Sequence, residues 1–138
     1  DRTQSHELNW FEVEAGSRRQ PLARVNIKLP SGEESVAEAS GDGPVDSIFG
    51  AIQKATGNDA ELREFRVGAV TGGDDALGEV TVTLRDEGRN ASGQGVSTDI
   101  LEASARAYVR ALSNLLDGMA TAEAEAATAD AASELTGP

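Results

Sequence analysis

Alternating apolar and polar residues predict three strands near the start of the chain. Residues 22–29 alternate cleanly between the two kinds. Residues 8–14 are predicted as an earlier strand, and residues 18–21 as the turn between the two. Residues 30–32, Pro-Ser-Gly, interrupt the pattern, and residues 34–40 are predicted as a weaker third strand.

A helix is predicted to follow, beginning at Pro44, because the missing N–H of proline has no intrahelical partner in a first turn. The apolar residues after it recur at helical spacing: Val45, Ile48, Phe49, Ile52 and Ala55. Gly57 is placed to end this helix. The order of the first unit is therefore βββα.

The second half of the chain repeats this order. Strands are predicted at residues 62–70 and 77–84, with a loop at residues 71–75 between them. A turn at residues 86–88 leads into a short strand before Gly93. A helix then completes a second βββα unit.

The second helix carries more signals than the first. Asp99 is expected to cap its start, with Glu102 three residues on as in a capping box, and Glu102 with Arg106 as an exposed ion pair. Its apolar stripe consists of Leu101, Ala105, Tyr108, Leu112 and Leu115. From Gly118 onward alanine and acidic residues dominate without an apolar face, so a frayed or disordered tail is expected.

The two units share a motif. Residues 39–49, Ala-Ser-Gly-Asp-Gly-Pro-Val-Asp-Ser-Ile-Phe, return at residues 91–101 as Ala-Ser-Gly-Gln-Gly-Val-Ser-Thr-Asp-Ile-Leu. Earlier apolar positions also correspond: Leu22, Val25, Ile27 and Leu29 with Leu77, Val80, Val82 and Leu84. Such self-similarity indicates one unit used twice. We therefore expect an α+β fold of two pseudo-symmetric βββα units with antiparallel strands.

Residues 1–7 are taken as a lead-in, residues 8–117 as one domain and residues 118–138 as the tail. Within the domain, unit one covers residues 8–58 and unit two residues 59–117. In each unit two glycines precede the helix. The two glycine-lined helix starts are expected to meet in a crevice suited to a small anionic or zwitterionic ligand.

Composition limits the possible partners. The chain has 138 residues, of which 38% are apolar, enough for one domain with a modest core. Its formal charge of −12, with two lysines and ten arginines, argues against nucleic acid or an anionic membrane, because phosphate binding needs clustered cations. A soluble, cytoplasmic segment is expected. The acidic surface fits a high-salt cytoplasm and an ordinary acidic protein equally, and the start at Asp1 suggests a fragment.

Few residues offer catalytic or metal chemistry. The chain has no cysteine, and its one histidine, His6, lies near the terminus, so no acid, base and nucleophile constellation is found. Asp74 and Asp75 lack the ligand spacing of a calcium loop. Gly41-x-Gly43 lacks the third glycine of a dinucleotide fingerprint. We expect no catalytic residue, metal site or cofactor in this chain.

Three segments together resemble the C-terminal allosteric domain of the 2-isopropylmalate synthase and citramalate synthase family. They are residues 39–49 with Gly-Asp-Gly-Pro-Val-Asp, residues 69–80 with Ala-Val-Thr and Asp-Ala-Leu-Gly-Glu-Val, and residues 93–104 with Gly-Gln-Gly and Thr-Asp-Ile-Leu-Glu-Ala-Ser. The resemblance covers about residues 8–117, with the segments in the family's order.

The resemblance implies a regulatory domain of two βββα units that pairs with the same domain of another subunit. It implies binding of the pathway's end product, leucine in 2-isopropylmalate synthases and commonly isoleucine in citramalate synthases. It also implies a parent acyltransferase whose separate TIM barrel uses a divalent metal and acetyl-CoA. Nothing in this chain matches that barrel or its HxH metal motif, so the fragment alone is expected to have no activity.

An amino-acid effector presents a carboxylate, an ammonium and an aliphatic side chain, all of which a receptor must satisfy. Helix-start N–H groups are candidates for the carboxylate, Asp42 or Asp46 for the ammonium, and apolar residues for the side chain. The candidate effector-binding residues are Gly41, Asp42, Gly43, Pro44, Val45, Asp46, Ile48, Val70, Ala91, Gly93, Gly95 and Ser97.

Each candidate also has a purely structural interpretation. Gly41 and Gly43 can be turn glycines, Asp46 and Asp99 can be helix caps, and apolar candidates such as Ile48 can belong to the core. A structural dimerisation module without a ligand pocket would have the same fold. A titration with branched-chain amino acids separates these two functions.

Overall fold

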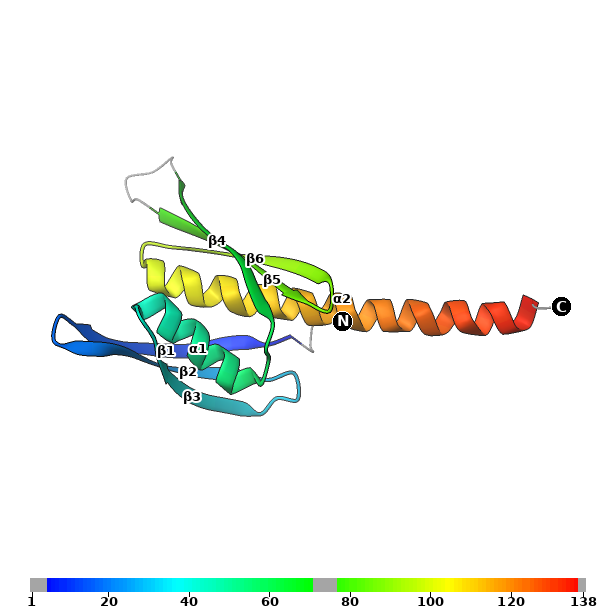
Figure 1. The fold of residues 1–138 in the computed structure, drawn as a ribbon, viewed down its shortest axis with the longest axis horizontal. Coiled ribbons are helices and arrows are strands. Elements are labelled where there is room, and N and C mark those ends of the chain that lie inside the picture. Colours follow the sequence, from blue (N-terminus) through cyan, green and yellow to red (C-terminus); the bar gives the residue numbers. More distant parts are fainter. Residues whose placement is uncertain (1–4, 71–76, 137–138) are drawn as a thin grey trace.

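The computed structural model describes residues 5–70 and 77–136, with side chains as far as Gly118 (Figure 1). The first unit consists of β1 (Glu7–Gly16), β2 (Arg19–Lys28), β3 (Glu34–Ser40) and α1 (Pro44–Thr56). The second unit consists of β4 (Glu61–Val70), β5 (Leu77–Asp86), β6 (Arg89–Ser97) and α2 (Ile100–Thr136). The predicted α+β fold, βββα used twice, is confirmed. The loop predicted at residues 71–75 lies outside the described residues.

Each unit folds as one antiparallel sheet with its strands in chain order, β1-β2-β3 and β4-β5-β6. Helix α1 packs on β2 and β3, and α2 packs on β5 and β6. Both helices lie between the two sheets, in contact with each other (Figure 1). Helix α2 also contacts β1, so it bridges the two units.

The predicted strand faces are confirmed at the central strands. Val25 and Ile27 of β2 are fully buried, as are Val80, Val82 and Leu84 of β5. Aromatic rings join the two halves of this core, because Phe49 of α1 lies against Tyr108 of α2 with ring centroids 4.8 Å apart. One hydrophobic core therefore serves both units.

Helix α1 begins and ends as its sequence predicts. Gly43 is the N-cap in an extended conformation, and Pro44 opens the first turn. At the other end Gly57 takes the left-handed conformation, with φ of 68°, and its N–H donates to the Gln53 carbonyl over 2.8 Å. Glycine tolerates that conformation because it has no Cβ.

The start of α2 is capped as predicted, although not by a capping box. The Asp99 side chain accepts a hydrogen bond from the Leu101 N–H over 2.9 Å. The predicted reach of Glu102 back to the Asp99 N–H is wrong, because the Ser97 hydroxyl accepts from that N–H instead (3.0 Å). Glu102 binds the Ser97 hydroxyl (3.2 Å) and Arg106 (2.9 Å), which confirms the predicted ion pair.

The first hairpin turn falls earlier than residues 18–21. Strand β1 ends at Gly16 and β2 begins at Arg19, opposite it, so Pro21 lies inside a strand. The register is irregular between Glu14 and Gly16, beside Pro21. Such an irregularity removes the need for the N–H that proline lacks. A proline near a predicted turn was therefore misleading.

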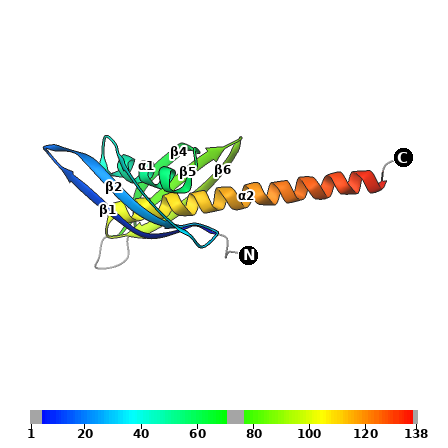
Figure 2. The same ribbon diagram turned by 90° about the horizontal axis from the view of Figure 1, so that it is seen from below.

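Helix α2 continues past Gly118 to Thr136 and projects beyond the two sheets in both views (Figures 1 and 2). A frayed or disordered backbone was expected there, whereas the structure is helical. Alanine-rich sequence has a high helix propensity, which accounts for the difference. The flexibility of this extension in solution stays a prediction.

Candidate functional site

The start of α1 holds the first group of candidate residues. Gly41 lies tightly against the helix: a Cβ there would be 2.9 Å from the Asp46 Cβ and 3.0 Å from the Ser47 nitrogen. At Gly43, in contrast, an added Cβ would meet nothing within 4 Å. Gly41 is therefore needed for the turn onto the helix, whereas the backbone at Gly43 is open to a neighbouring molecule.

The first turn of α1 also has backbone donors without intrahelical partners. The first backbone bond of the helix runs from the Ser47 N–H to the Gly43 carbonyl over 3.0 Å, so the N–H groups of Val45 and Asp46 precede it. No side chain caps this helix start. Two amides at the positive end of the helix dipole are a favourable position for a carboxylate.

The side chains around this turn differ in exposure. Asp42 and Asp46 are exposed, and Val45 is half-buried. Ile48 is fully buried within the core cluster, so it does not line a surface pocket. The Ser47 hydroxyl bonds the carbonyls of Pro21 (3.2 Å) and Gly43 (2.9 Å), which anchors the turn to β2. The α1 start therefore combines open donors, two carboxylates and one apolar side chain.

The second glycine pair does not open a helix. Gly93 and Gly95 lie inside β6 and are buried beneath α2. A Cβ on Gly93 would lie 2.6 Å from the Ala107 carbonyl oxygen, and one on Gly95 would collide with the Ala103 carbonyl. These glycines let a helix lie close on a strand, so the prediction that they line a helix-start crevice is wrong.

Strand register shows why the motif repeat misled. Gly95 pairs with Val80, which pairs with Val67 of β4. The counterpart of Val67 in β1 is Val13, which pairs with Ala23, and Ala23 pairs with Ala39. Ala39, not Gly43, is therefore the structural equivalent of Gly95. The shared Gly-x-Gly letters are out of register with the duplication of the fold.

The remaining candidates are dispersed. Ala91 of β6 is partly buried against the core. The Ser97 hydroxyl is bonded to Glu102 and to the Asp99 N–H at the start of α2. Val70 is exposed at the end of β4. Both helices do begin at the same end of the molecule (Figures 1 and 2). Only the segment from Gly41 to Asp46 therefore keeps the expected character of a ligand site.

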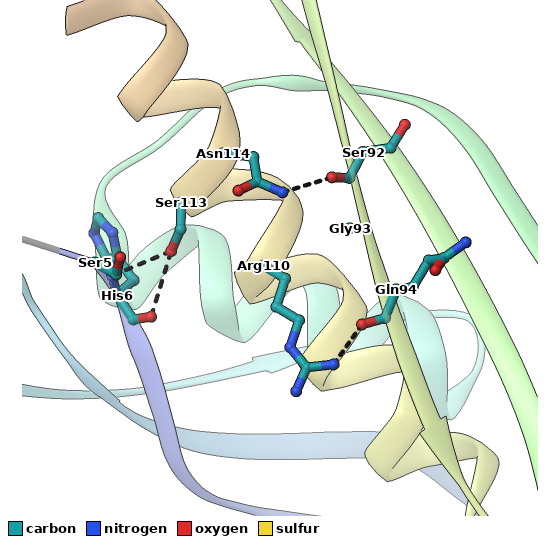
Figure 3. A pocket seen from close by; sticks show the side chains of 8 residues that line it. All are labelled: Ser5, His6, Ser92, Gly93, Gln94, Arg110, Ser113 and Asn114. Carbon is teal, nitrogen blue, oxygen red and sulfur yellow. Dashed lines mark hydrogen bonds between the residues drawn. The ribbon is translucent and has the colours of Figure 1, made fainter. Parts of the chain in front are cut away.

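Two cavities described in the structure lie elsewhere. One of about 450 Å³ separates the start of β1 from β6 and α2 (Figure 3). Its lining is mostly polar: Ser5, His6, Ser92, Gly93, Gln94, Arg110, Ser113 and Asn114. A second, of about 270 Å³, lies between β1 and α2 and is lined by His6, Glu7, Leu8, Arg106, Val109 and Arg110. Gly93 is the single effector candidate among these lining residues.

The polar groups of the larger cavity are largely bonded to one another. Ser113 Oγ accepts from the His6 N–H (3.1 Å) and donates to the His6 carbonyl (3.3 Å). Arg110 donates to the Gln94 carbonyl, and Asn114 to the Ser92 carbonyl, over 2.6 and 2.8 Å (Figure 3). Burial lowers the pKa of His6, which favours its neutral form. These bonds fasten α2 to β1 and β6, a role that sequence spacing did not reveal.

Within residues 5–70 and 77–136 no group of three or more potential metal ligands occurs. No helix in that part of the chain is long and apolar enough to cross a membrane. The two βββα units form a small α+β domain rather than a catalytic TIM barrel. The model of the LeuA allosteric (dimerisation) domain matches residues 1–116, and the chain belongs to this family.

Curated relatives agree with this family. The chain is 53% identical over 119 residues to a 2-isopropylmalate synthase of Caulobacter sp. strain K31, a match that covers 86% of this chain and 22% of the relative. It is 46% identical over 114 residues to the 2-isopropylmalate synthase of Carboxydothermus hydrogenoformans, covering 82% and 22%. The chain thus spans about a fifth of these relatives, and it matches only their regulatory domain.

Proposed function

We propose that this domain senses leucine for a 2-isopropylmalate synthase and mediates feedback inhibition of that enzyme. This proposal rests on the match to an allosteric domain family and on relatives that are 2-isopropylmalate synthases. The rest of the parent protein would hold the TIM barrel, with its divalent metal and acetyl-CoA. The domain pairs with a second copy of itself.

The start of α1 is the site we assign to the effector. The leucine carboxylate would accept from the N–H groups of Val45 and Asp46, which precede the first bond of the helix. Asp42 or Asp46 would face the ammonium, and the half-buried Val45 would contact the aliphatic side chain. Open space at Gly43 lets the ligand reach the backbone.

Inhibition follows from linkage between ligand and domain arrangement. Leucine shifts the enzyme toward an inactive arrangement only if it binds that arrangement more tightly than the active one. A coupling of about 1 to 3 kcal/mol is typical of such regulation. The domain itself needs no catalytic group for this role.

Calorimetric titration of the chain with leucine, isoleucine and valine tests the proposal. Leucine should bind with a dissociation constant of about 1 µM to 1 mM and raise the melting temperature by mass action. Gly43→Val should abolish binding, because the branched side chain fills the approach to the amides. Gly16→Val is the matched control, since a Cβ at Gly16 meets only the Arg19 side chain, at 3.9 Å.

Each other outcome has a definite meaning. Preference for isoleucine would identify the regulatory domain of a citramalate synthase instead. Binding that survives Gly43→Val would move the site away from α1. An absence of heat and of thermal shift with all three amino acids would leave a structural dimerisation module as the function.

A further inference from the structure

The edge strands β1 and β4 carry the same apolar motif in the same geometry. Glu-Leu-x-x-Phe-x-Val begins at Glu7 in β1 and again at Glu61 in β4. Each strand has a register irregularity directly after its leucine. The irregularity brings the leucine, phenylalanine and valine of each motif to one face of the sheet.

In both strands that face is the core face. Leu62, Phe65 and Val67 of β4, called here the β4 strip, pair with residues of β5 that are fully buried, namely Leu84, Val82 and Val80. Directly paired residues in an antiparallel sheet project from the same side. The β4 strip is therefore an extension of the hydrophobic core.

The two motifs differ in what covers them. Leu8, Phe11 and Val13 of β1 are partly buried against the core, and α2 contacts β1. The β4 strip is open, with Leu62 43% exposed and Val67 49% exposed. Among the described elements only β5 has its backbone beside β4. Phe65 is 39% exposed and meets Phe49 of α1 edge to face, with ring centroids 5.8 Å apart and an interplanar angle of 77°. Helix α1 thus covers the strip incompletely.

Charge indicates which molecule can cover the β4 strip. The chain as a whole carries −12, which opposes association of two copies. Strand β4 is locally neutral, because its two arginines balance its two glutamates in the pairs Arg63–Glu61 (3.1 Å) and Arg66–Glu64 (3.0 Å). Strand β1 has three glutamates, of which Glu12 and Glu14 are paired with Arg24 and Arg19 of β2 (3.5 and 3.0 Å). A second copy can approach β4 without net repulsion from the charges of that strand.

We infer that the β4 strip is the contact surface for a second copy of this chain. The two copies meet around a two-fold axis near Phe65, so that the strips bury each other. Glu64 and Arg66 project from the opposite face of β4 and are paired with each other, so they leave no net charge beside the contact. A long exposed edge strand with an apolar face is otherwise an aggregation hazard. The inference rests on the pairing proposed above and gives it a location.

Light scattering after size-exclusion chromatography measures the mass of two variants, one with a valine changed in the β4 strip and one with a valine changed on β3. Val67→Glu places a charge in the strip and should weaken the dimer about 100-fold or more, because like charges then face each other in the contact. Val36→Glu alters a valine of β3 that is 55% exposed, and it should leave the dimer intact. Both positions are on the surface, and circular dichroism confirms that each variant keeps its fold.

A crosslinking measurement provides independent support. The chain has no cysteine, so Gly68→Cys on β4 and Val36→Cys on β3 each introduce one thiol per chain. A Cβ at Gly68 meets nothing within 4 Å, so this variant should fold normally. A short thiol crosslinker should join two chains through Cys at position 68 and not through position 36.

The outcomes separate the surface from the pairing itself. A dimeric Val67→Glu variant, or crosslinking at position 36 alone, would overturn the β4 strip while leaving the dimerising domain in place. A monomeric unchanged chain across the micromolar range would overturn both, and would mean that another part of the parent protein covers β4. Neither measurement involves leucine, so a failure of leucine binding would contradict the proposed effector site without contradicting the β4 contact.

Discussion

The two helices of this domain begin in opposite ways. Helix α1 starts at a glycine without a side-chain cap, and its first amides have no partner within the helix. Helix α2 starts at Asp99, whose carboxylate accepts from a first-turn N–H, with Ser97 and Glu102 bonded alongside. The duplicated fold therefore keeps one helix start available for a ligand and closes the other with its own side chains.

Glycines divide in the same manner. Gly43 faces open space, whereas Gly95 faces the backbone of a packed helix. One glycine leaves room for another molecule, and the other leaves room for the protein itself. The two glycines are not structural equivalents, so the same Gly-x-Gly letters stand in different surroundings in the two units.

The largest expected effect is a difference in stability between substitutions at Gly95 and at Gly43. Gly95→Val should destabilise the domain by about 3 kcal/mol or more, because the side chain would have to enter the space of the α2 backbone. Gly43→Val should cost about 1 kcal/mol or less, the difference between two N-cap residues. Thermal melts of the two variants measure this contrast, and equal midpoints would contradict the packing role of Gly95.

The next largest effect is expected when the cap of α2 is removed and a cap is added to α1. Asp99→Ala should cost about 1 kcal/mol of stability through loss of a cap, with no change in leucine affinity. Gly43→Asp should stabilise α1 by up to about 1 kcal/mol and abolish leucine binding, because its carboxylate would occupy the same amides. Melting curves and calorimetry together report both quantities. Leucine binding that persists in Gly43→Asp would contradict the site.

A smaller effect concerns the point where the helices meet. Tyr108 is buried against Phe49, and its hydroxyl makes no hydrogen bond within the described residues. Burial raises the pKa of this hydroxyl, and the nearby side chains of Gln53 and Asn58 act in the opposite direction, although neither lies in hydrogen-bonding geometry with it. Tyr108→Phe should leave stability unchanged or raise it by up to about 1 kcal/mol, because an unsatisfied buried group is removed. Denaturant unfolding measures the change, and a loss of stability would show that the hydroxyl has a partner.

The smallest effect is the pH dependence of the closed helix start. Hydrogen bonds from Arg106 and then Ser97 lower the pKa of Glu102. The ionised carboxylate is thus favoured in the folded state, so its contribution is present above the ordinary value of 4.5 and is lost as pH falls through the lower folded pKa. Glu102 is partly exposed, so the contribution is a few tenths of a kcal/mol.

Comparison of melting midpoints for the unchanged chain and Glu102→Gln measures this effect. The difference should be present at neutral pH and should disappear as the pH falls through the lowered pKa of folded Glu102. A difference that stays constant with pH would mean that the Glu102 side chain acts through packing rather than charge.

Most of the fold was predictable because its signals are local. Strand alternation around Val25 and Val80 identified the buried faces, and Pro44, Gly57 and Asp99 marked helix ends through their own backbone chemistry. Pro21 misled because a strand irregularity, which depends on a partner strand, accommodates it. Local chemistry sets where elements begin and end, whereas irregularities in pairing do not appear in one strand alone.

The candidate site was only partly predictable. A Gly-x-Gly pair has the same letters whether it serves a turn, as at Gly41, or close packing of a helix, as at Gly93. Only tertiary structure separates the two. The repeated motif at Leu8 and Leu62 was visible in the sequence, but each leucine reaches the core face only through a register irregularity. The motif also cannot show that just one of the two strands is covered.

The bridging position of α2 has a consequence for how the chain folds. Ser113 of α2 bonds the backbone of His6, 107 residues earlier, so the first strand is fastened by the last helix. Contacts between residues this far apart in sequence slow folding, because a long loop must close before they form. During synthesis the core face of β1 emerges first and is covered only after α2 has been made. The domain therefore completes its core late, when nearly all of its residues have left the ribosome.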